Sequence, residues 1–302
     1  MYTICGGNFL VSRFFTLFLT LLVAAGLAAD RKVNPTFLYR HIPNVAEKGS
    51  DVTTPTCHYK PVFGMGDSEP GPLRGITRFG EITVDPNGSC QAVTYPAEEQ
   101  VYYVTEGKGA LHYAADKAPV RKNDFMYLPP TVSHALANES GQPLRVLVYG
   151  YRIPNWVKAT VPEKLQIANK EEVKLQQVGG HPPSSLFQLL MGDTTSTRDR
   201  LASARILTSL FIMEFAPGGT NLPHHHDREE EIYVVLDGDG DMVAGGGVDG
   251  VENKRPAKAG DAYFFRLNCT VGFYSNPDQS LPKAHILAAR STYPFPPSRR
   301  QQ

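Results

Sequence analysis

Strand-like patterns of apolar and polar positions occur twice along the chain, about 130 residues apart. The first, EEQVYYVTEGKG at residues 98–109, has an acidic start, a run of β-branched and aromatic residues, and a Gly-x-Gly turn. The second, EEEIYVVLDGDG at residues 229–240, repeats this order of residue types. Such runs bounded by glycine turns are typical of β-strands. The pattern therefore predicts two similar β units rather than one large domain.

The match continues downstream of these two stretches. NDFMYL at residues 123–128 corresponds to GDAYFF at residues 260–265, and both predict a turn followed by a buried strand. Each unit then ends in an apolar strand, at residues 144–151 and 284–289. The 27 glycines and 24 prolines exceed the roughly 12% of average usage, so many turns and short strands are expected.

Residues 1–29 predict a targeting segment. The uncharged apolar run FFTLFLTLLVAA, residues 14–25, follows Arg13 and precedes the small residues GLAA. Because the run is shorter than the about 20 apolar residues of a membrane-spanning helix, we expect a signal peptide cleaved after Ala28 or Ala29. An uncleaved membrane anchor is the alternative. Cleavage predicts a secreted or periplasmic protein.

The overall composition narrows the classes of partner. Of 302 residues, 41% are hydrophobic and 20% are charged, as expected of a folded protein. The 30 basic and 30 acidic residues balance, which removes a bulk electrostatic reason to bind nucleic acid or an anionic membrane. We therefore expect a small-molecule substrate as partner, no nucleic acid, and no membrane after signal cleavage.

Three cysteines remain after the signal peptide: Cys57, Cys90 and Cys269. In an oxidising compartment, an odd number allows one disulfide and one free thiol. A Cys57–Cys90 disulfide and three buried thiols are both compatible with the sequence.

Candidate chemistry is concentrated in PGGTNLPHHHDREEE, residues 217–231. Side chains of a strand alternate between its two faces, so His224 and His226 share one face and the histidine between them points to the other. Glu231 begins the next strand in phase with Tyr233, which should face the interior of the unit. Glu231 is therefore expected to face inward, near both histidines.

This convergence of two imidazoles and a carboxylate suits a divalent metal ion. A buried carboxylate without a partner is costly, and a cation removes that cost. An exposed acidic, histidine-rich loop is the alternative interpretation. The mixed nitrogen and oxygen donors predict one divalent transition metal, with iron or manganese favoured and zinc, nickel or copper possible.

The spacing of these residues matches the first cupin motif, G-x5-H-x-H-x4-E-x6-G. Gly218, His224, His226, Glu231 and Gly238 satisfy every interval. Over most of its length the chain resembles a two-domain cupin, or bicupin. The resemblance implies an all-β fold of two antiparallel jelly-roll β-barrels with few short helices. It also implies that His224, His226 and Glu231 are metal ligands.

On this basis the chain is expected to divide into two barrels with a segment before, between and after them. The expected ranges are a signal peptide at 1–29, an N-terminal arm at 30–74, an N-terminal cupin barrel with a degenerate metal motif at 75–152, a linker with entry strands at 153–200, a C-terminal cupin barrel with the metal motif at 201–292, and a tail at 293–302. Since a bicupin reproduces a cupin dimer in one chain, we expect a monomer, or a homo-oligomer formed through exposed sheet edges.

The second cupin motif, G-x5-P-x-G-x2-H-x3-N, is incomplete in the C-terminal unit. Gly260 fits, but Arg266 and Asn268 replace proline and glycine, and Val271 stands where a histidine is the fourth ligand. Either the metal keeps two histidines and one carboxylate with open positions, or His285 on the last strand completes the set. Asn268, at the mouth of the barrel, is a candidate for contact with substrate, and a turn residue is the alternative.

The N-terminal unit departs from the motifs in the complementary way. Val93, Tyr95 and Gln100 replace the two histidines and the glutamate, whereas His134 of the second motif is retained. This set predicts a poor metal site, and we expect His134 to be a hydrogen-bonded core residue. A metal-free ligand pocket is the alternative.

Together these features predict a secreted, metal-binding bicupin that acts as an enzyme on a small organic substrate at the metal, with dioxygenase-type chemistry favoured. Its catalytic residues are undetermined, with Tyr233 and Asn268 as candidates. The layout also resembles the ureidoglycine aminohydrolases, a hydrolytic alternative, and a non-catalytic binding or storage-type bicupin is another. The histidines without ligand spacing are expected to be ordinary: His41, His58, His112 and His181.

Overall fold

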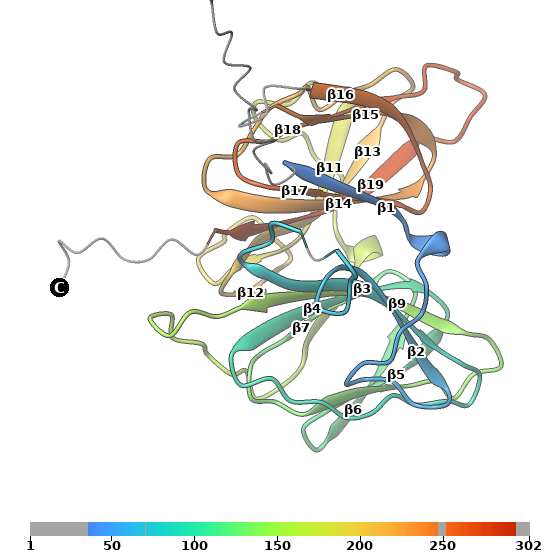
Figure 1. Ribbon diagram of the computed structural model, residues 1–302, viewed down its shortest axis with the longest axis vertical. Coiled ribbons are helices and arrows are strands. Elements are labelled where there is room, and N and C mark those ends of the chain that lie inside the picture. The colour runs from blue at the N-terminus through green and yellow to red at the C-terminus, as the bar shows by residue number, and fades with distance from the viewer. Residues whose placement is uncertain (1–35, 70, 247–251, 294–302) are drawn as a thin grey trace, which may run out of the picture. The chain divides into compact units, whose positions relative to one another are not determined.

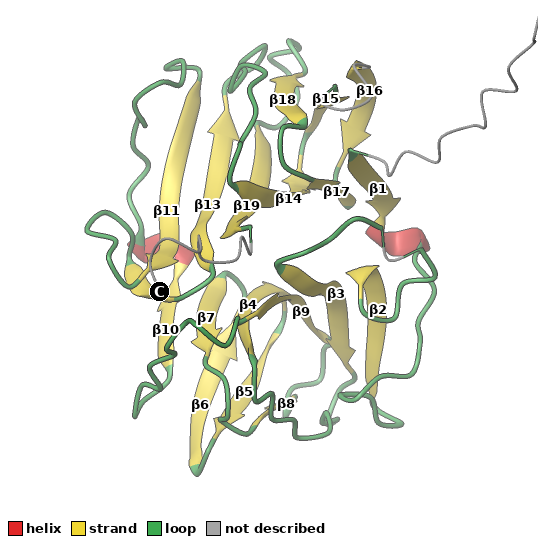
Figure 2. Ribbon diagram, turned by 60° about the vertical axis from the view of Figure 1, so that its left-hand side comes forward, coloured by secondary structure: helices red, strands yellow, loops and turns green. Residues whose placement is uncertain are grey.

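The computed structural model describes residues 36–69, 71–246 and 252–293 (Figure 1), and the predicted signal peptide lies outside them. In these residues the chain forms nineteen β-strands and two short 3-10 turns, η1 (Ile42–Asn44) and η2 (Lys170–Glu172). Figure 2 shows the dominance of strands over these two turns. The predicted all-β fold of two antiparallel jelly-roll barrels is confirmed. Over the same ranges, no helix is long and apolar enough to cross a membrane.

The N-terminal barrel consists of two antiparallel sheets. The larger has the strand order β10-β7-β4-β9-β3-β2 and the smaller the order β6-β5-β8. Apolar side chains fill its interior, among them Tyr102, Leu111 and Met126. The strand bounds are β2 (Cys57–Gly64), β3 (Ile76–Val84), β4 (Glu98–Glu106), β5 (Lys108–Tyr113), β6 (Asp116–Arg121), β7 (Asp124–Leu128), β8 (His134–Ala137), β9 (Leu144–Arg152) and β10 (Gln166–Asn169).

The C-terminal barrel has the same architecture. Its larger sheet has the order β1-β17-β14-β19-β13-β11-β12 and its smaller one the order β16-β15-β18. Only β11 and β12 pair in parallel among the described strands. Met213, Tyr233 and Phe273 belong to the apolar interior. The strand bounds are β1 (Phe37–His41), β11 (Ser185–Asp193), β12 (Leu201–Ala204), β13 (Leu207–Phe215), β14 (Glu229–Asp237), β15 (Asp239–Gly245), β16 (Glu252–Lys258), β17 (Asp261–Phe265), β18 (Thr270–Ser275) and β19 (Ala284–Thr292).

The larger sheets are apolar on both faces, as β19 illustrates. Ile286 and Ala288 pack inside the C-terminal barrel, whereas Leu287 and Ala289 belong to a separate apolar cluster. That cluster also contains Phe79 of the N-terminal barrel. A strand buried on both sides explains why these segments read as continuous apolar runs in the sequence. The barrels are therefore held together by a shared hydrophobic core.

The strands extend beyond the barrel ranges expected from the sequence, 75–152 and 201–292. β2 lies in the expected arm but pairs with β3, whereas β11 pairs with β13 as an entry strand of the second unit, within the expected linker with entry strands. β10 follows β9 along the chain and pairs with β7 of the same barrel. β1 lies in the expected arm and pairs with β17, so the C-terminal barrel is completed by a strand that the chain order places before the N-terminal barrel.

Two buried glutamates at matching positions connect the barrels, Glu99 of β4 and Glu230 of β14. Each carboxylate accepts three backbone N–H groups around the start of a strand in the other barrel. The donors to Glu99 are Arg205 at 2.8 Å, Ile206 at 2.8 Å and Leu207 at 2.9 Å. The donors to Glu230 are Arg74 at 2.8 Å, Gly75 at 2.7 Å and Ile76 at 3.3 Å. Burial raises the pKa of Glu230 to about 7, against the opposing effect of these bonds.

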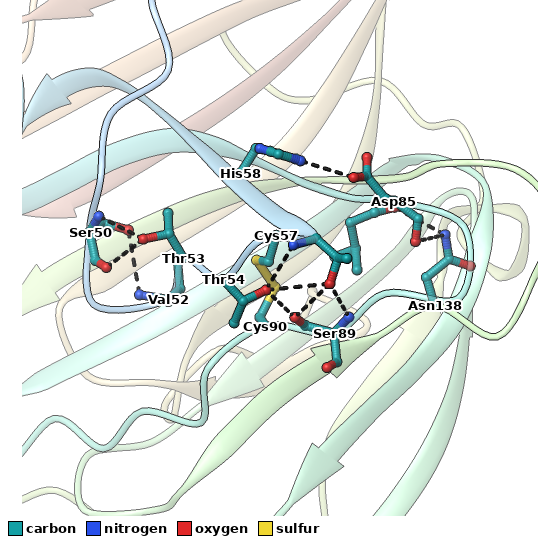
Figure 3. Close-up of a disulfide and its surroundings, with 12 residues drawn as sticks. Ser50, Val52, Thr53, Thr54, Cys57, His58, Asp85, Ser89, Cys90 and Asn138 are labelled. Atoms are coloured by element: carbon teal, nitrogen blue, oxygen red, sulfur yellow. Dashed lines mark hydrogen bonds and ion pairs between the residues drawn. A yellow bond between two sulfur atoms is a disulfide. The ribbon is translucent and has the colours of Figure 1, made fainter.

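A disulfide joins Cys57 at the start of β2 to Cys90 in the N-terminal barrel (Figure 3). The Thr54 hydroxyl donates a hydrogen bond to the Ser89 carbonyl at 2.6 Å beside it. Cys269 is a buried thiol outside this disulfide, and its sulfur accepts a hydrogen bond from the Gly245 N–H at 3.3 Å. Of the two alternatives left open by the sequence, the structure contains one disulfide and one thiol.

Candidate metal centre

The loop before β14 fixes the first histidine of the motif. His224 and Val271 exchange backbone hydrogen bonds, with N–O distances of 3.0 and 2.8 Å. The buried Asn221 side chain holds the loop against the barrel. It donates to the Tyr233 hydroxyl at 3.2 Å and accepts from the Phe273 N–H at 2.8 Å. Leu222 adopts a φ of 57°, an unusual angle for a bulky residue. This backbone places the Leu222 carbonyl 2.8 Å from His224 Nδ1.

The structure brings together the three side chains that the sequence singled out. The rings of His224 and His226 are 4.9 Å apart between centroids and nearly perpendicular, at 88°. His226 Nε2 lies 3.3 Å from Glu231 Oε2, and the Glu231 side chain is only 2% exposed. His224 and His226 lie in the loop before β14 rather than in a strand, and both line the same cavity as Glu231.

Arg290 of β19 lies beside this group, since it is the cross-strand partner of Glu231. Its Nε is 3.6 Å from Glu231 Oε1, and its Nη1 is 3.6 Å from Glu229 Oε2. The guanidinium also lies over the ring of Phe211, 5.2 Å from the centroid. The site thus combines a carboxylate, two imidazoles and a guanidinium in a largely buried space.

Burial and the neighbouring charges act differently on the two histidines. Burial lowers the pKa of His224, which favours the neutral imidazole that a metal ion requires. Burial also lowers the pKa of His226, but its close approach to the Glu231 carboxylate outweighs this effect and raises the pKa overall. Without a bound cation, the nearby Glu231 carboxylate therefore favours the protonated form of His226.

Several atoms of this group are buried without a hydrogen-bond partner. Among the described residues, they include His226 Nε2, both carboxylate oxygens of Glu231, and Arg290 Nε. Each such atom costs on the order of 1–3 kcal/mol if it stays unpaired. A divalent cation would satisfy the imidazole and the carboxylate, so the donor set fits the metal that the motif implies. Arg290 Nε is 3.6 Å from Glu231 Oε1, too far for a good hydrogen bond, so an oxygen of a bound molecule could accept from it.

The space between these side chains is small. A cavity of about 20 Å³, room for about one water molecule, is lined by His224, His226, Glu231, Arg290 and eight other residues. Across residues 36–69, 71–246 and 252–293, no three His, Cys, Asp or Glu side chains are already gathered closely enough to hold an ion. Metal binding therefore requires the histidine side chains to rotate toward Glu231.

The other predicted site residues have different surroundings. Tyr233 lines the cavity and is fully buried, with its hydroxyl accepting from Asn221. Asn268 is exposed in a left-handed turn with φ of 58°, and its backbone N–H donates to the His226 carbonyl at 2.8 Å. Its contribution in the described structure is therefore to the turn, the alternative that the sequence left open.

His285 is not brought to the site, contrary to its role as a candidate ligand. Its ring nitrogens contact Asp237 at 2.5 Å and Glu214 at 3.2 Å. His285 alternates along β19 with Ile286, which faces the barrel interior. The side chain therefore points to the opposite face of the sheet from Glu231, and strand alternation excludes it from the ligand set.

Sequence reasoning missed two of the residues at this site, Arg290 and His181. Arg290 alternates in phase with Ile286 and Ala288, so strand periodicity could have placed it inside the barrel. His181 comes from the segment between the barrels and also lines the cavity. Its only sequence signal is its position between two glycines and two prolines, which indicates a tightly shaped turn.

The corresponding part of the N-terminal barrel lacks such a donor set. His134 is 3% exposed, with Nδ1 3.1 Å from the Val132 carbonyl and Nε2 3.2 Å from Gln100 Oε1. Burial lowers its pKa. The prediction of a hydrogen-bonded core histidine is confirmed.

Comparisons with known proteins agree with this architecture. A Cupin domain model matches residues 80–150 and again residues 211–281. An uncharacterized protein of Methanocaldococcus jannaschii is 36% identical over 83 residues, which is 27% of this chain and 66% of that protein, just under two thirds of its length.

Solved structures share the fold over nearly the whole chain. Protein Ylba of E. coli has a TM-score of 0.65 at 16% identity, covering 88% of this chain and 95% of its own. A deletion mutant of Bacillus subtilis oxalate decarboxylase has a TM-score of 0.61 at 11% identity, covering 83% of this chain and 76% of its own. Mn(II) centres are described for that Bacillus enzyme. The chain therefore contains two cupin domains, one on each jelly-roll barrel.

Proposed function

We propose that the C-terminal barrel binds one divalent transition metal through His224, His226 and Glu231, and that the protein is a metal-dependent enzyme. The observation that carries this proposal is that His224, His226 and the buried Glu231 carboxylate line one cavity, where His226 Nε2 lies 3.3 Å from Glu231 Oε2. Iron or manganese is favoured because the donors are mixed nitrogen and oxygen. The Mn(II) centres of the oxalate decarboxylase with the same fold support this choice.

The proposed substrate is a small organic molecule with a negatively charged oxygen group. Arg290 has a buried Nε without an acceptor, and its guanidinium lies beside the proposed metal ligands. An anionic oxygen would pair with Arg290 while the rest of the molecule contacts the apolar wall that includes Phe211 and Met213. A carboxylate is the simplest group of this kind.

A bound metal would supply oxygen activation or carbonyl polarisation, of which we favour dioxygenase-type chemistry. The protein itself supplies orientation and proton control. Tyr233 accepts a hydrogen bond from Asn221, which leaves its own proton available to the cavity. Because burial raises the pKa of Tyr233 well above its usual value, this residue stays protonated and acts as a hydrogen-bond donor.

A secreted or periplasmic location belongs to the same proposal. The Cys57–Cys90 disulfide supports it, because such bonds form and persist in oxidising compartments.

A non-catalytic, metal-retaining bicupin is the second candidate. The observation that favours it is the cavity of about 20 Å³, which has room for a water molecule and not for an organic substrate. An enzyme would have to enlarge this space by moving the segment that contributes Val178 and His181. The two candidates therefore differ in turnover rather than in metal content.

The test is metal content by mass spectrometry, on the wild-type protein and on the His226→Ala and His225→Ala variants. His225 is exposed beside the site and serves as the matched control. We expect one equivalent of iron or manganese in the wild type and in His225→Ala, and none in His226→Ala. Oxygen uptake is then measured with a panel of small carboxylates. Oxygen uptake by the wild type and His225→Ala, but not by a folded His226→Ala, supports the enzyme. A lower melting temperature of His226→Ala, with no turnover by any of the three proteins, supports the second candidate.

A wild type that binds no added Fe(II), Mn(II) or Zn(II) contradicts the metal site itself. In that case neither candidate stands.

A further inference from the structure

We infer that His181, from the segment between the two barrels, supplies a third imidazole to the proposed metal ion. This inference rests on the proposed metal site of the C-terminal barrel. It starts from the second-motif position, where Val271 replaces the histidine that would be the fourth ligand. The Val271 side chain is buried in the apolar interior of the barrel and offers no metal ligand. Its backbone forms the paired hydrogen bonds with His224.

The three imidazoles form a continuous row along the cavity. The ring of His181 is 5.7 Å from that of His224 between centroids, and the ring of His224 is 4.9 Å from that of His226. Imidazoles that bind one ion at about 2.1 Å through their ring nitrogens have centroids on the order of 5 Å apart. Small side-chain rotations are therefore enough to bring His181 and His224 to one ion.

The ring nitrogens of His181 and His224 have matching partners. His181 Nδ1 lies 3.3 Å from the Asn221 carbonyl, and His224 Nδ1 lies 2.8 Å from the Leu222 carbonyl. A carbonyl oxygen can only accept a hydrogen bond, so each Nδ1 carries the proton. In the neutral rings, each Nε2 is then free to bind a metal, which is how ligand histidines are usually oriented. Burial lowers the pKa of both residues, consistent with neutral rings.

These two carbonyls belong to consecutive residues of a constrained loop. The Asn221 side chain holds the loop through Tyr233 and Phe273, and Leu222 keeps its left-handed φ of 57° directly before a proline. Strain of this kind persists when the surroundings enforce it, and it is common at functional sites. The loop therefore orients one histidine from the first motif and one from outside both motifs.

The segment that carries His181 is also fixed in place. The Gln176–Phe187 bridge closes the segment, and the His181 ring packs on Phe187 at 4.7 Å between centroids. This packing is the competing explanation, in which His181 is a wall residue. The two explanations differ in whether His181 contributes a nitrogen to the ion.

The experiment counts ligand nitrogens directly. Cu(II) is bound to the purified full chain, and pulsed electron paramagnetic resonance determines the number of coordinated imidazoles. We expect three in the wild type and in the His225→Ala control, and two in His181→Ala. Calorimetric titration with Mn(II) should show an affinity at least about 10- to 100-fold weaker for His181→Ala.

Two imidazoles in the wild type overturn the inference, whether or not the variant folds. A weaker affinity without loss of an imidazole also overturns it, because it assigns His181 to packing. Both results leave the proposed metal site intact. A wild type that binds neither ion contradicts the proposed function instead, so the two failures can be distinguished.

Discussion

Each barrel has one arginine at the same cross-strand pair, but on opposite strands, and Arg78 is buried whereas the Arg290 side chain is 23% exposed. In the N-terminal barrel Arg78 of β3 pairs with Gly150 of β9. In the C-terminal barrel Ser209 of β13 pairs with Arg290 of β19. A Cβ on Gly150 would lie 2.7 Å from Cγ of Arg78, so the small partner is required for the guanidinium to fit. Both barrels therefore have an arginine at this pair of positions. It lies on β3 in the N-terminal barrel and on β19 in the C-terminal barrel.

The surroundings of the two arginines differ. Arg78 donates to both Asp51 oxygens at 3.0 and 3.1 Å and lies 3.0 Å from Glu98. Gln100 donates to the same Glu98 at 2.7 Å and contacts His134. This network provides its own anions and leaves little need for a ligand.

Arg290 has no such closed network. Its contacts to Glu229 and Glu231 are both 3.6 Å, longer than the 3.0 Å contacts of Arg78 to Asp51 and Glu98. At the same position of one fold, an arginine can thus be fully paired with side chains of the protein, as Arg78 is, or more loosely paired beside a proposed ligand site, as Arg290 is. In the N-terminal barrel, the closing anion Asp51 comes from the segment before β2.

The largest expected effect comes from removing the two arginines in turn. Arg78→Met should cost about 3–5 kcal/mol of unfolding free energy, because it leaves Glu98 buried without its cation. Arg290→Met should cost about 1 kcal/mol or less, as for partly exposed ion pairs, and should keep Mn(II) binding. Urea denaturation of both variants measures this. Equal losses would show that the two networks are equivalent and would break the comparison.

The disulfide sharpens the contrast, since it lies in the N-terminal barrel only. The Cys57–Cys90 bond closes a loop of sequence separation 33. Replacing both cysteines by serine should therefore lower the unfolding free energy by about 3 kcal/mol. Calorimetric melting measures the loss, with Cys269→Ser as the control for a buried thiol. Unchanged Mn(II) affinity is expected, and a fall in affinity would contradict the independence of the two interiors.

A third change makes the C-terminal site resemble the N-terminal one. Glu231→Gln copies the residue at the matching position, Gln100. Mn(II) affinity should fall by about 100-fold, roughly 2.7 kcal/mol, because the charged ligand is lost. The reciprocal Gln100→Glu should not create metal binding, since Val93 and Tyr95 offer no imidazole. Calorimetric titration checks both, and retained affinity in Glu231→Gln would argue against Glu231 as a ligand.

The sequence predicted those features that depend on neighbouring residues of one segment, and not those that depend on contacts between segments far apart along the chain. The alternation of a single strand placed Glu231 in phase with Tyr233, and the spacing placed His224 and His226 on one face. Both are local rules, so they could be applied without knowing the fold. The same rule, applied to β19, would have excluded His285 and pointed to Arg290.

The remaining features depend on contacts between distant segments. His181 reaches the cavity from the linker, and Asp51 reaches Arg78 from the expected arm. The pairing of β1 with β17 of the C-terminal barrel is also set by contact between distant segments rather than by local pattern. Register across strands has no signature in one sequence, which is why these elements were missed.

The smallest expected effect concerns pH and the pair Glu99 and Glu230. Burial raises the pKa of the Glu99 carboxyl, outweighing its bonds to the backbone of Arg205, Ile206 and Leu207. The folded state therefore binds a proton more readily than the unfolded state, so this group favours folding at low pH, and that contribution is lost as pH rises above about 4.5.

Glu99→Gln removes this titration and should flatten the pH dependence of unfolding between acid and neutral pH, with a change on the order of 1 kcal/mol. Urea denaturation of both proteins at a series of pH values measures the slope. The amide oxygen can still accept the Ile206 and Leu207 N–H groups, whereas the amide nitrogen replaces the oxygen that accepts from Arg205. The variant should therefore keep two of the three backbone hydrogen bonds at this junction. If the wild type instead gains stability as pH rises, the Glu99 carboxylate is better held ionised by its three N–H donors than burial allows. The junction would then work as a charged anchor, and the two barrels would be joined by electrostatics as much as by their shared core.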